Sequence, residues 1–561
     1  MIRVRRVLLA GVTVLAAAAT YAVAVSTADG ATTAAAPVTP RLVCDLANRQ
    51  TDLEKFTCET KKAARVEGGK PVGVADVNRA YDDLGDFRDF MSRYVGRDSV
   101  DGRGMPLRAV VRACDQLGCP QMYWDGRQLV AGEDFVLADD LAGHELTHGV
   151  NQFTANFYYG YQSGAIDESM ADVFGEFVDQ TYKTPGTKDG PAYDWLIGED
   201  TAEWAPVRSM KDPTKAAGTD GYRSPDRMRS PLYFVPAYET GTGEPEDSGG
   251  VHYNSGVGNK AAYLITASGA KTFNGQTVTG IGIAKAAKLY YRVLGLLPSA
   301  ATYTDLADAL TTACTQLATA GTGGFTTTDC TQVSRAITAT EMRLAPAQAG
   351  AALTKPAPIC GAGEVRTAVD GDGFEQAARA RWTLTGAWHY PPANGHAHGD
   401  VKFHANAREG KQALQSYIPY TASTSTVRKS TATWNSTVKV PTGATTYLRF
   451  QHDRAMQTED GKHLGAGYVE YRADGGAWTD ASKLFTDNGY TGNLNAASGY
   501  GTAKGFTGNT HGYTASRLNL TPLAGHQVQF RFVSVIDKEL RLSTWWIDDV
   551  RAYTCGPAAG Y

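Results

Sequence analysis

Apolar side chains recur at helical spacing in three parts of the chain. Residues 74–95 show this pattern at every third or fourth position, as at Val77, Tyr81, Leu84, Phe87 and Met91. Residues 136–182 repeat it in two stretches separated by a loop rich in tyrosine and glycine, and residues 255–345 show it again. Because positions three or four apart share one face of a helix, we expect helices in all three regions.

The pattern changes to alternation after residue 360. In the segment HQVQFRFVSV, Val528, Phe530 and Phe532 would lie on one face of a strand, with polar side chains on the other. Asp474-Gly475 stands where a tight hairpin turn is expected. Short alternating runs separated by turns predict an all-β sandwich, which we assign to the jelly-roll type.

The N-terminal residues indicate export. Three arginines precede an apolar run that ends in the small-x-small pattern Ala22-Val23-Ala24. We therefore expect a signal peptide at residues 1–24, a short leader at 25–37, and a secreted, extracellular protein without stable membrane insertion. The alternative is an uncleaved membrane anchor, but alanine and threonine make this run only weakly hydrophobic.

Composition narrows the class of protein. The chain has 561 residues, 42% of them hydrophobic and 20% charged, so it can build several globular cores. Its net charge is −4 and no basic face is evident, so nucleic acid is not an expected partner. We expect a monomer.

An even number of cysteines in an exported chain favours disulfide bonds. A cysteine zinc cluster is the alternative, but the chain has no C-x-x-C pair. Sequence alone does not fix the connectivity of eight cysteines. Their spacing suggests Cys44–Cys58, Cys114–Cys119, Cys314–Cys330 and Cys360–Cys555.

The segment DLAGHELTHGVNQFT carries the clearest chemistry. On a helix, His144 and His148 are four positions apart and share one face, so both imidazoles can bind one zinc ion. Glu145 adjoins the first histidine and can move a proton from zinc-activated water to the leaving amine. A solvated helix with two surface histidines is the alternative reading.

Residues further along the chain complete this site. A catalytic zinc ion takes three protein ligands, and Glu168 in the helical segment GAIDESMADVFGEF suits the third. Asp172, one turn later, can accept the far N–H of a ligand histidine, although such an acidic pair can also be a solvated face. Only three of eleven histidines precede residue 350, and the third of these, His252, lies in DSGGVHYNSG. From that loop it can donate a hydrogen bond to an oxyanion.

Residues 38–345 resemble the thermolysin family of secreted neutral metalloproteases. HELTH matches the family's first zinc motif, and GAIDESMAD matches its glutamate motif, GAINEAxSD. The metzincin pattern does not fit, because Asn151 and Thr154 occupy the positions of its glycine and third histidine. The resemblance implies an α+β two-lobed zinc metallopeptidase, with a β-rich/α N-terminal lobe, an α-helical C-terminal lobe and an active-site cleft between them.

The resemblance also implies roles for further residues. His252 would be the transition-state histidine with Asp247 as its carboxylate partner, Tyr159 would help to bind the oxyanion, and Arg208 would hold a substrate carbonyl. The edge strand that pairs with extended substrate would comprise Gln121, Met122, Tyr123 and Trp124. A pocket for a bulky apolar residue just after the scissile bond would be lined by Leu141, Ile197 and Val207.

A structural calcium site is implied as well. Its ligands would be Asp140, Asp179, Asp194 and Glu199, whose alternative reading is ordinary surface acids. The chain departs from the family in several places: Gln121 and Met122 replace Asn-Ala, and the leader is far shorter than the usual prosegment. The remaining departures are Asp167 and Ser248, each in place of asparagine, and Leu196 in place of a calcium-site glutamate.

The C-terminal region resembles, more loosely, the jelly-roll modules appended to secreted peptidases and glycoside hydrolases, chiefly through STWWIDDVRAYTC. Such a module would bind glycan or cell wall, or act only as a cap. Trp545 and Trp546 would stack on sugars unless they pack in the core. We expect a signal peptide at 1–24, a leader at 25–37, an N-terminal catalytic lobe at 38–182, a helical lobe at 183–344, a linker at 345–359 and a sandwich at 360–561.

The sequence thus predicts a secreted zinc endopeptidase that acts on protein or peptide substrates, with zinc and calcium as its metals. The alternative is a secreted glycan- or cell-wall-binding protein whose protease fold is inactive. The survival of His144, Glu145, His148 and Glu168 together argues against that alternative.

Overall fold

The computed structural model describes most of the chain after residue 37. The described residues are 38–182, 187–188, 190, 194–201, 206–215, 223–235, 246–347, 355–375, 381–391, 397–398, 401–402, 406–418, 428–456, 458–459, 462–494, 504–536 and 543–557. The predicted signal peptide and leader lie outside them. Within the described parts, no helix has both the length and the apolar character needed to span a bilayer.

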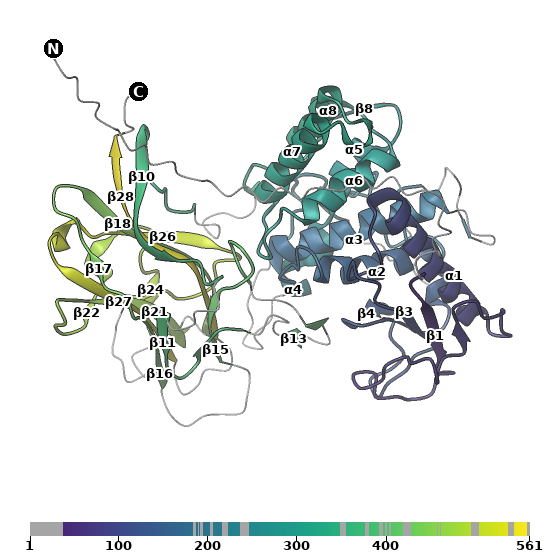
Figure 1. The fold of residues 1–561 in the computed structure, drawn as a ribbon, viewed down its shortest axis with the longest axis horizontal. Helices are drawn as coiled ribbons and strands as arrows, with labels where there is room; N and C mark the ends of the chain where they lie inside the picture. The colour runs from purple at the N-terminus through teal and green to yellow at the C-terminus, as the bar shows by residue number, and fades with distance from the viewer. Residues whose placement is uncertain are drawn as a thin grey trace, which may run out of the picture. The chain divides into compact units, whose positions relative to one another are not determined.

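The N-terminal part of the described chain builds a five-stranded mixed sheet (Figure 1). The strand order is β2-β1-β3-β5-β4, in which β1, β3 and β5 are parallel and the two edge strands are antiparallel to their neighbours. The segment predicted as an edge strand is therefore β4, at one edge of this sheet. The strands are β1 (Arg41–Asp45), β2 (Arg65–Val66), β3 (Leu107–Val111), β4 (Met122–Trp124) and β5 (Leu129–Ala131).

The helix predicted within residues 74–95 is confirmed as α1 (Ala75–Phe90), which continues through a π-helical turn at Met91–Val95. Its apolar stripe packs into the core, where Val77, Leu84 and Phe87 are fully buried. The helix ends at Gly96, whose φ of 70° is a left-handed conformation that glycine adopts at low cost.

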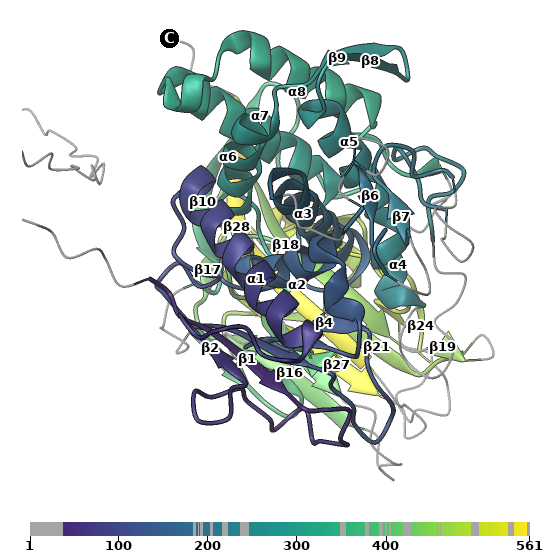
Figure 2. The same cartoon turned by 90° about the vertical axis from the view of Figure 1, so that its right-hand side faces the viewer.

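The two helices predicted within residues 136–182 are α2 (Asp139–Gln152) and α3 (Tyr161–Thr181), which lie side by side in Figures 1 and 2. Glycine permits their close approach. A Cβ atom on Gly175 would lie 2.4 Å from the carbonyl oxygen of Asp140, and one on Gly143 would lie 3.0 Å from the Cα of Gly175. This contact brings the HELTH turn of α2 opposite the GAIDESMAD turn of α3.

Helices also form the following region, as predicted for residues 255–345. The threonine-aspartate capping boxes Thr302/Asp305 and Thr326/Asp329 begin α7 and α8. The helices are α4 (Asp247–Asn254), α5 (Gly256–Thr266), α6 (Ile283–Leu294), α7 (Tyr303–Thr319) and α8 (Thr327–Ala339). Two small hairpins accompany them: β6 (Leu196–Ile197) with β7 (Arg208–Ser209), and β8 (Ala270–Phe273) with β9 (Gln276–Thr279).

The C-terminal part is an antiparallel β sandwich, as the alternating pattern predicts. One sheet has the order β12-β15-β28-β18-β26-β23 with β10 also on β28, and the other has β11-β16-β27-β21-β22 with β17 also on β27. The first sheet comprises β10 (Glu364–Asp372), β12 (Trp388–His389), β15 (Leu414–Ile418), β18 (Thr445–Met456), β23 (Phe485–Asp487), β26 (Thr514–Asn519) and β28 (Ser543–Pro557). The second comprises β11 (Trp382–Leu384), β16 (Arg428–Trp434), β17 (Val438–Lys439), β21 (Gly465–Ala473), β22 (Thr479–Asp480) and β27 (Gln527–Ile536).

Three short ribbons complete the described strands: β13 (Ala397–His398) with β14 (Val401–Lys402), β19 (Thr458–Glu459) with β20 (Lys462–His463), and β24 (Gly492–Asn493) with β25 (Lys504–Gly505). The turn predicted at Asp474-Gly475 follows β21, and both of its residues have positive φ, at 49° and 75°. Such a pair is typical of the tight turns that match strand twist.

Aromatic side chains fill the space between the two sheets. Phe530 and Phe532 are buried there on the predicted inner face of β27. Trp545 is 1% exposed in the same core, and Trp546 is 3% exposed in a smaller cluster, so neither offers an open platform for a sugar ring. The predicted disulfide pairing is confirmed for all four bonds, including the bond that joins Cys360 to Cys555 at the two ends of the sandwich.

Candidate metal centre

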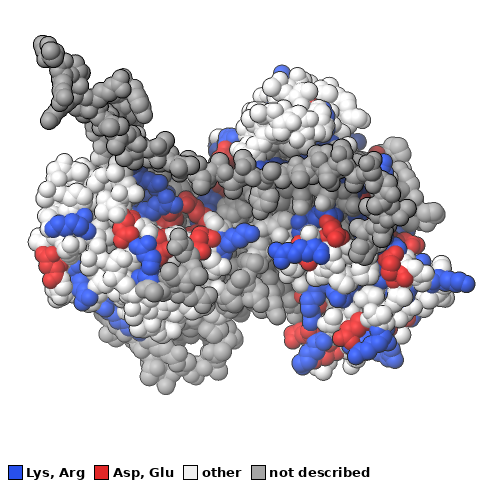
Figure 3. Space-filling model, in the orientation of Figure 1, with Lys and Arg blue, Asp and Glu red and all other residues white. Residues whose placement is uncertain are grey.

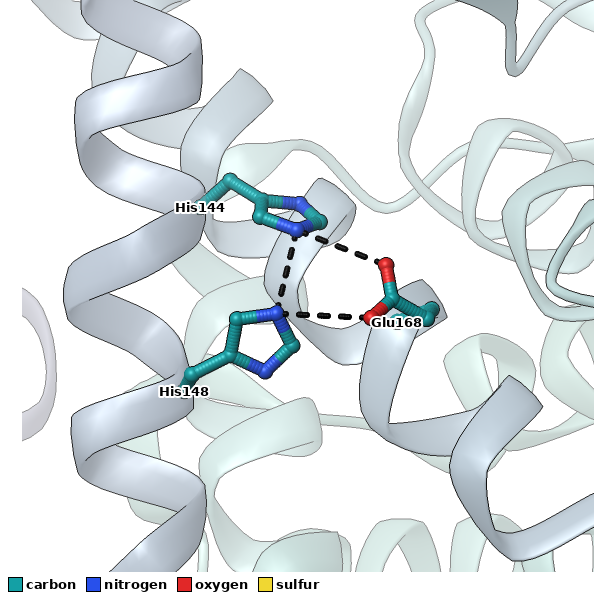
Figure 4. A group of neighbouring side chains, drawn as sticks. All are labelled: His144, His148 and Glu168. Carbon is teal, nitrogen blue, oxygen red and sulfur yellow. Dashed lines mark hydrogen bonds and ion pairs between the residues drawn. The ribbon is translucent and has the colours of Figure 1, made fainter. Parts of the chain in front are cut away.

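Three side chains converge between α2 and α3 (Figure 4). His144 and His148 point from successive turns of α2, and Glu168 faces them from α3. The Nε2 atoms of the two histidines are 3.1 Å apart. Each of these nitrogens lies 3.5 Å from an oxygen of Glu168. The group is nearly enclosed, since the side chain of Glu168 is 1% exposed and that of His144 is 6% exposed.

The donor set fits a zinc ion. Two imidazole nitrogens and a carboxylate are the ligands that catalytic zinc sites use. Atoms held about 2.0–2.1 Å from a tetrahedral zinc ion lie roughly 3.3 Å from one another, which is close to the observed separations. Oε2 of Glu168 is buried and accepts no hydrogen bond within the described protein. His144, His148 and Glu168 therefore fit the zinc site that the sequence predicts.

Carboxylates hold the outer nitrogens of both histidines. Nδ1 of His144 is 2.8 Å from Oδ1 of Asp172, which is the contact the helical spacing predicts. Nδ1 of His148 is 3.1 Å from Oδ1 of Asp167, a partner the sequence reading did not foresee. Each contact leaves Nε2 free to face the other ligands, because the nitrogen that bonds a carboxylate carries the proton.

Asp172 is itself held on several sides. The Arg208 guanidinium donates to both of its carboxylate oxygens, at 2.7 and 2.6 Å, and Asn259 donates to Oδ2 at 2.7 Å. Burial raises the pKa of Asp172, but Arg208 and His144 outweigh this and hold the pKa below its ordinary value. The sequence reading missed Asn259, which lies on α5.

The carboxylates around the two histidines create a negative electrostatic potential at both imidazole rings. Burial lowers the pKa of His144, but Asp172 and Glu168 overcome it and raise the value to about 10. For His148, burial again lowers the pKa, and Asp167 and Glu168 raise it to about 9. The histidines thus stand where positive charge is stabilised, which a divalent cation also satisfies.

Glu145 lies beside the three converging side chains. The backbone N–H of Trp124, on the edge strand β4, donates to its Oε2 at 2.9 Å. Burial raises the pKa of Glu145, whereas His144 and His148 lower it, and the net change is upward. A carboxyl group with a raised pKa is suited to accept and release a proton near neutral pH.

Tyr159 and His252 close the other side of the centre. The Tyr159 hydroxyl donates to Oε1 of Glu168 at 2.5 Å and lies 3.2 Å from Nε2 of His252. Asp247 receives the backbone N–H of His252 at 2.9 Å and lies 2.5 Å from its Nδ1. The His252 side chain is 42% exposed, so its Nε2 can reach a bound molecule.

Two neighbouring cavities meet at this centre. The first, of about 170 Å³, is lined by His144, Glu145, His148, Tyr159, Glu168, His252 and the strand residues Met122, Tyr123 and Trp124, among others. The second, of about 530 Å³, is lined by Gln121, Met122, Leu141, Val207, Arg208, Asp247 and His252, among others. Ile197 does not line either cavity. It is fully buried, and its carbonyl accepts the N–H of Val207.

A group of buried acids lies at the other end of the α2–α3 pair. Asp140 on α2 and Asp179 on α3 are buried with Glu199. Burial and the neighbouring carboxylates raise the pKa of Asp140 to about 7 and that of Glu199 to about 11. Asp194 is half-buried and lies within electrostatic reach of the group.

The sequence reading missed one member of this acidic group, Glu176. Its side chain is fully buried on α3, and its Oε2 accepts no hydrogen bond within the described protein. Its spacing was a usable signal, because Glu176 lies one turn after Asp172 and one turn before Asp179 on the same helix.

Two helical histidines, a glutamate from the next helix and a second glutamate beside them define a zinc-peptidase class of site. The sequence profile of the thermolysin metallopeptidase catalytic domain matches residues 42–152, and that of the thermolysin metallopeptidase alpha-helical domain matches residues 155–340. Over these residues, which make up about half of its length, the chain belongs to the thermolysin family of metallopeptidases.

Individual relatives agree with this assignment. The chain is 41% identical over 324 residues to a zinc metalloproteinase of Renibacterium salmoninarum, which covers 53% of this chain and 57% of that protein. It is 38% identical over 220 residues to a thermolysin of Alicyclobacillus acidocaldarius subsp. acidocaldarius, covering 37% of this chain and 35% of that protein. The chain thus matches 57% of the length of the first relative and 35% of the length of the second.

Among solved structures, the precursor of protealysin, a metalloproteinase from Serratia proteamaculans, is similar with a TM-score of 0.43 and 26% identity. It covers 56% of this chain and 91% of that chain.

Proposed function

We propose that the protein is a zinc-dependent endopeptidase. The observation that carries the proposal is the convergence of His144, His148 and Glu168, with Glu145 beside them, at the wall of a cavity bordered by an edge strand. The family relationship supports the same reaction. An edge strand next to a metal centre suits an extended peptide, because its outward backbone groups can pair with the substrate.

Each side chain around the cavity has a separate role in the proposed hydrolysis. When bound, zinc supplies Lewis-acid chemistry that polarises the substrate carbonyl and makes water more acidic. Glu145 takes the proton from the attacking water and passes it to the leaving amine. His252 and Tyr159 donate hydrogen bonds to the oxyanion that develops on the carbonyl, and Asp247 keeps the His252 ring in place.

The direction of the backbone in β4 selects the residue that meets the substrate. Along an antiparallel strand, successive residues turn their N–H and C=O groups to opposite sides. The carbonyl of Gln121 accepts the N–H of Gly132, on the inner side, whereas Trp124 donates outward to Glu145. Met122 therefore presents its backbone groups outward, and we assign the main pairing with substrate to it.

The larger cavity supports a preference for a bulky apolar residue just after the scissile bond. Leu141 and Val207 line it together with Met122 and Phe135, so a hydrophobic side chain would exchange water for apolar contacts there. Arg208 borders the same cavity and can donate to a substrate carbonyl. Ile197 supports the wall from behind rather than contacting the substrate.

Chelation of the metal tests the proposed reaction. Casein hydrolysis by the purified protein should be lost after treatment with a zinc-selective chelator and should return when zinc is added back. Release of internal fragments from a peptide blocked at both ends would distinguish an endopeptidase from an exopeptidase. Undiminished hydrolysis by protein shown to contain no zinc would contradict the proposal.

We propose that the buried acids bind calcium. Asp140, Glu176, Asp179 and Glu199 place several carboxylates together out of water, where like charges repel unless a hard cation or protons neutralise them. Calcium chelation should therefore lower the midpoint of thermal unfolding at neutral pH, and Glu176→Gln should weaken the response to added calcium. An unfolding midpoint that is indifferent to calcium would contradict this assignment.

Secretion and a glycan or cell-wall ligand for the β sandwich stay predictions from the sequence. The burial of Trp545 and Trp546 removes the two aromatic side chains that the sequence offered as sugar platforms. The full-length Glu145→Gln variant can be mixed with insoluble cell wall and sedimented. Its recovery in the pellet would support the binding role, and its recovery only in the supernatant would contradict it.

A further inference from the structure

The short segment that joins α2 to α3 touches both the metal centre and the β sandwich. We call residues 158–161 the tyrosine segment. Tyr159 in its middle bonds Glu168 and faces His252. On either side of it, Tyr158 packs edge-to-face against Trp546 at 6.3 Å between ring centroids, and Tyr161 packs in the same way against His511 at 5.4 Å.

A hydrogen bond fixes the second of these contacts. Nδ2 of Asn509 donates to the hydroxyl of Tyr161 at 2.5 Å. The side-chain oxygen of Asn509 accepts the backbone N–H of His511 at 2.6 Å, so the asparagine also orders its own loop. Asn509 thus bonds its own loop through its side-chain oxygen and the start of α3 through its side-chain nitrogen.

A second set of contacts anchors the sandwich beside the tyrosine segment. The backbone of Ala407 exchanges hydrogen bonds with Ser299 and Ala300, at 2.9 to 3.2 Å. Arg408 donates to both carboxylate oxygens of Asp305, which belongs to the capping box of α7, at 2.6 and 2.7 Å. The described residues after Val38 belong to a single compact unit, and these contacts lie within it.

Tyr161 also packs against the segment that carries His252. A Cβ atom on Gly249 would lie 2.4 Å from Cδ1 of Tyr161, so the tyrosine ring packs directly on that backbone. Four consecutive residues here, Asp247, Ser248, Gly249 and Gly250, have positive φ. Non-glycine residues hold such a conformation only where their surroundings enforce it.

We infer that the β sandwich is a positioning element for the peptidase site, acting through Asn509 and Tyr161 on the segment that presents Asp247 and His252. This inference rests on the proposed peptidase function. Asn509 and Tyr161 do not line the cavities and are positioning residues. Their loss should misplace the oxyanion donors while leaving zinc and substrate binding intact.

The test compares three variants of the full-length protein. Asn509→Ala removes the donor, Tyr161→Phe removes only the accepting hydroxyl, and Asn493→Ala is the matched control at an exposed position of the same sandwich. The first two should lower kcat about 3- to 10-fold with KM and zinc content unchanged, as expected for one lost hydrogen bond. The combined variant should lose less activity than the two single losses together predict, because both changes break the same bond between Asn509 and Tyr161.

Amide hydrogen exchange provides a readout that does not depend on activity. Exchange at residues 247–252 should be faster in Asn509→Ala and Tyr161→Phe than in wild type, and unchanged in Asn493→Ala. Wild-type kcat together with wild-type exchange in both variants would overturn the inference. If wild type cuts no peptide yet exchange accelerates as expected, the proposed function fails while the structural coupling stands.

Discussion

Each histidine of the metal centre is oriented by a carboxylate on its outer nitrogen. Asp172 serves His144 and Asp167 serves His148. Asp172 could be predicted, because it lies one helical turn after Glu168. Asp167 precedes Glu168 directly, and sequence alone does not indicate which way its side chain turns.

These carboxylates should set the affinity for zinc. Asp172→Asn should weaken zinc binding about 10- to 100-fold, because the neutral amide accepts less strongly from His144 than the carboxylate does. Competition with a chromogenic chelator measures this directly. Asp167→Asn makes the same change at His148, where Asn151 also donates to the carboxylate at 2.6 Å. Wild-type affinity in both variants would contradict the assigned roles.

At the scale of elements, the spacing of apolar residues correctly predicted the helices and strands that bury only one face. The apolar stripe of α1 and the alternating face of β27 both bury the residues that the pattern selects. Contacts between elements were less predictable. Asn259 on α5 meets Asp172 across 87 positions of sequence, and no local pattern records that approach.

A buried histidine in the sandwich should make the folded protein less stable in mild acid. His452 on β18 is fully buried, its Nδ1 accepts from Trp545 at 3.3 Å, and its Nε2 lies 3.0 Å from the hydroxyl of Ser516. Burial, together with the charge of Arg454, holds its pKa well below the ordinary value. Below about pH 6.5, His452 therefore takes up a proton in the unfolded chain but stays neutral in the folded protein.

Stability should accordingly be lower at pH 5 than at pH 7.5. His452 alone should lower the free energy of unfolding by up to about 1.4 kcal/mol for each pH unit below 6.5. Urea unfolding at the two pH values measures the difference. His452→Gln should reduce the pH dependence, although it lowers stability at pH 7.5. Equal pH dependence in wild type and His452→Gln would be evidence against this account.

At the scale of the whole molecule, the sandwich is bound to the peptidase part through Asn509, Arg408 and Trp546. The sequence predicted the sandwich as an appended module and gave no sign of this contact. Asn509 and Tyr161 are 348 positions apart, and their pairing depends on how two separate hydrophobic cores meet. The residue limits of the domains stay predictions.

The described residues on one face of the molecule are mixed in charge. On the face drawn in Figure 3, basic and acidic side chains are interspersed rather than gathered by sign. Carboxyl groups also gather in the interior, around His144 and His148 and in the acidic group near Glu199. Under the proposed function, zinc would neutralise the first group and calcium the second.

The most direct test of the central claim compares wild type with Glu145→Gln, both loaded with zinc, on an internally quenched peptide with a bulky apolar residue after the scissile bond. The account predicts one zinc ion per chain in each protein and a kcat/KM at least about 100-fold lower in the variant, because glutamine cannot take the proton. Equal hydrolysis by the two zinc-loaded proteins would contradict the assignment of Glu145 and, with it, the proposed mechanism.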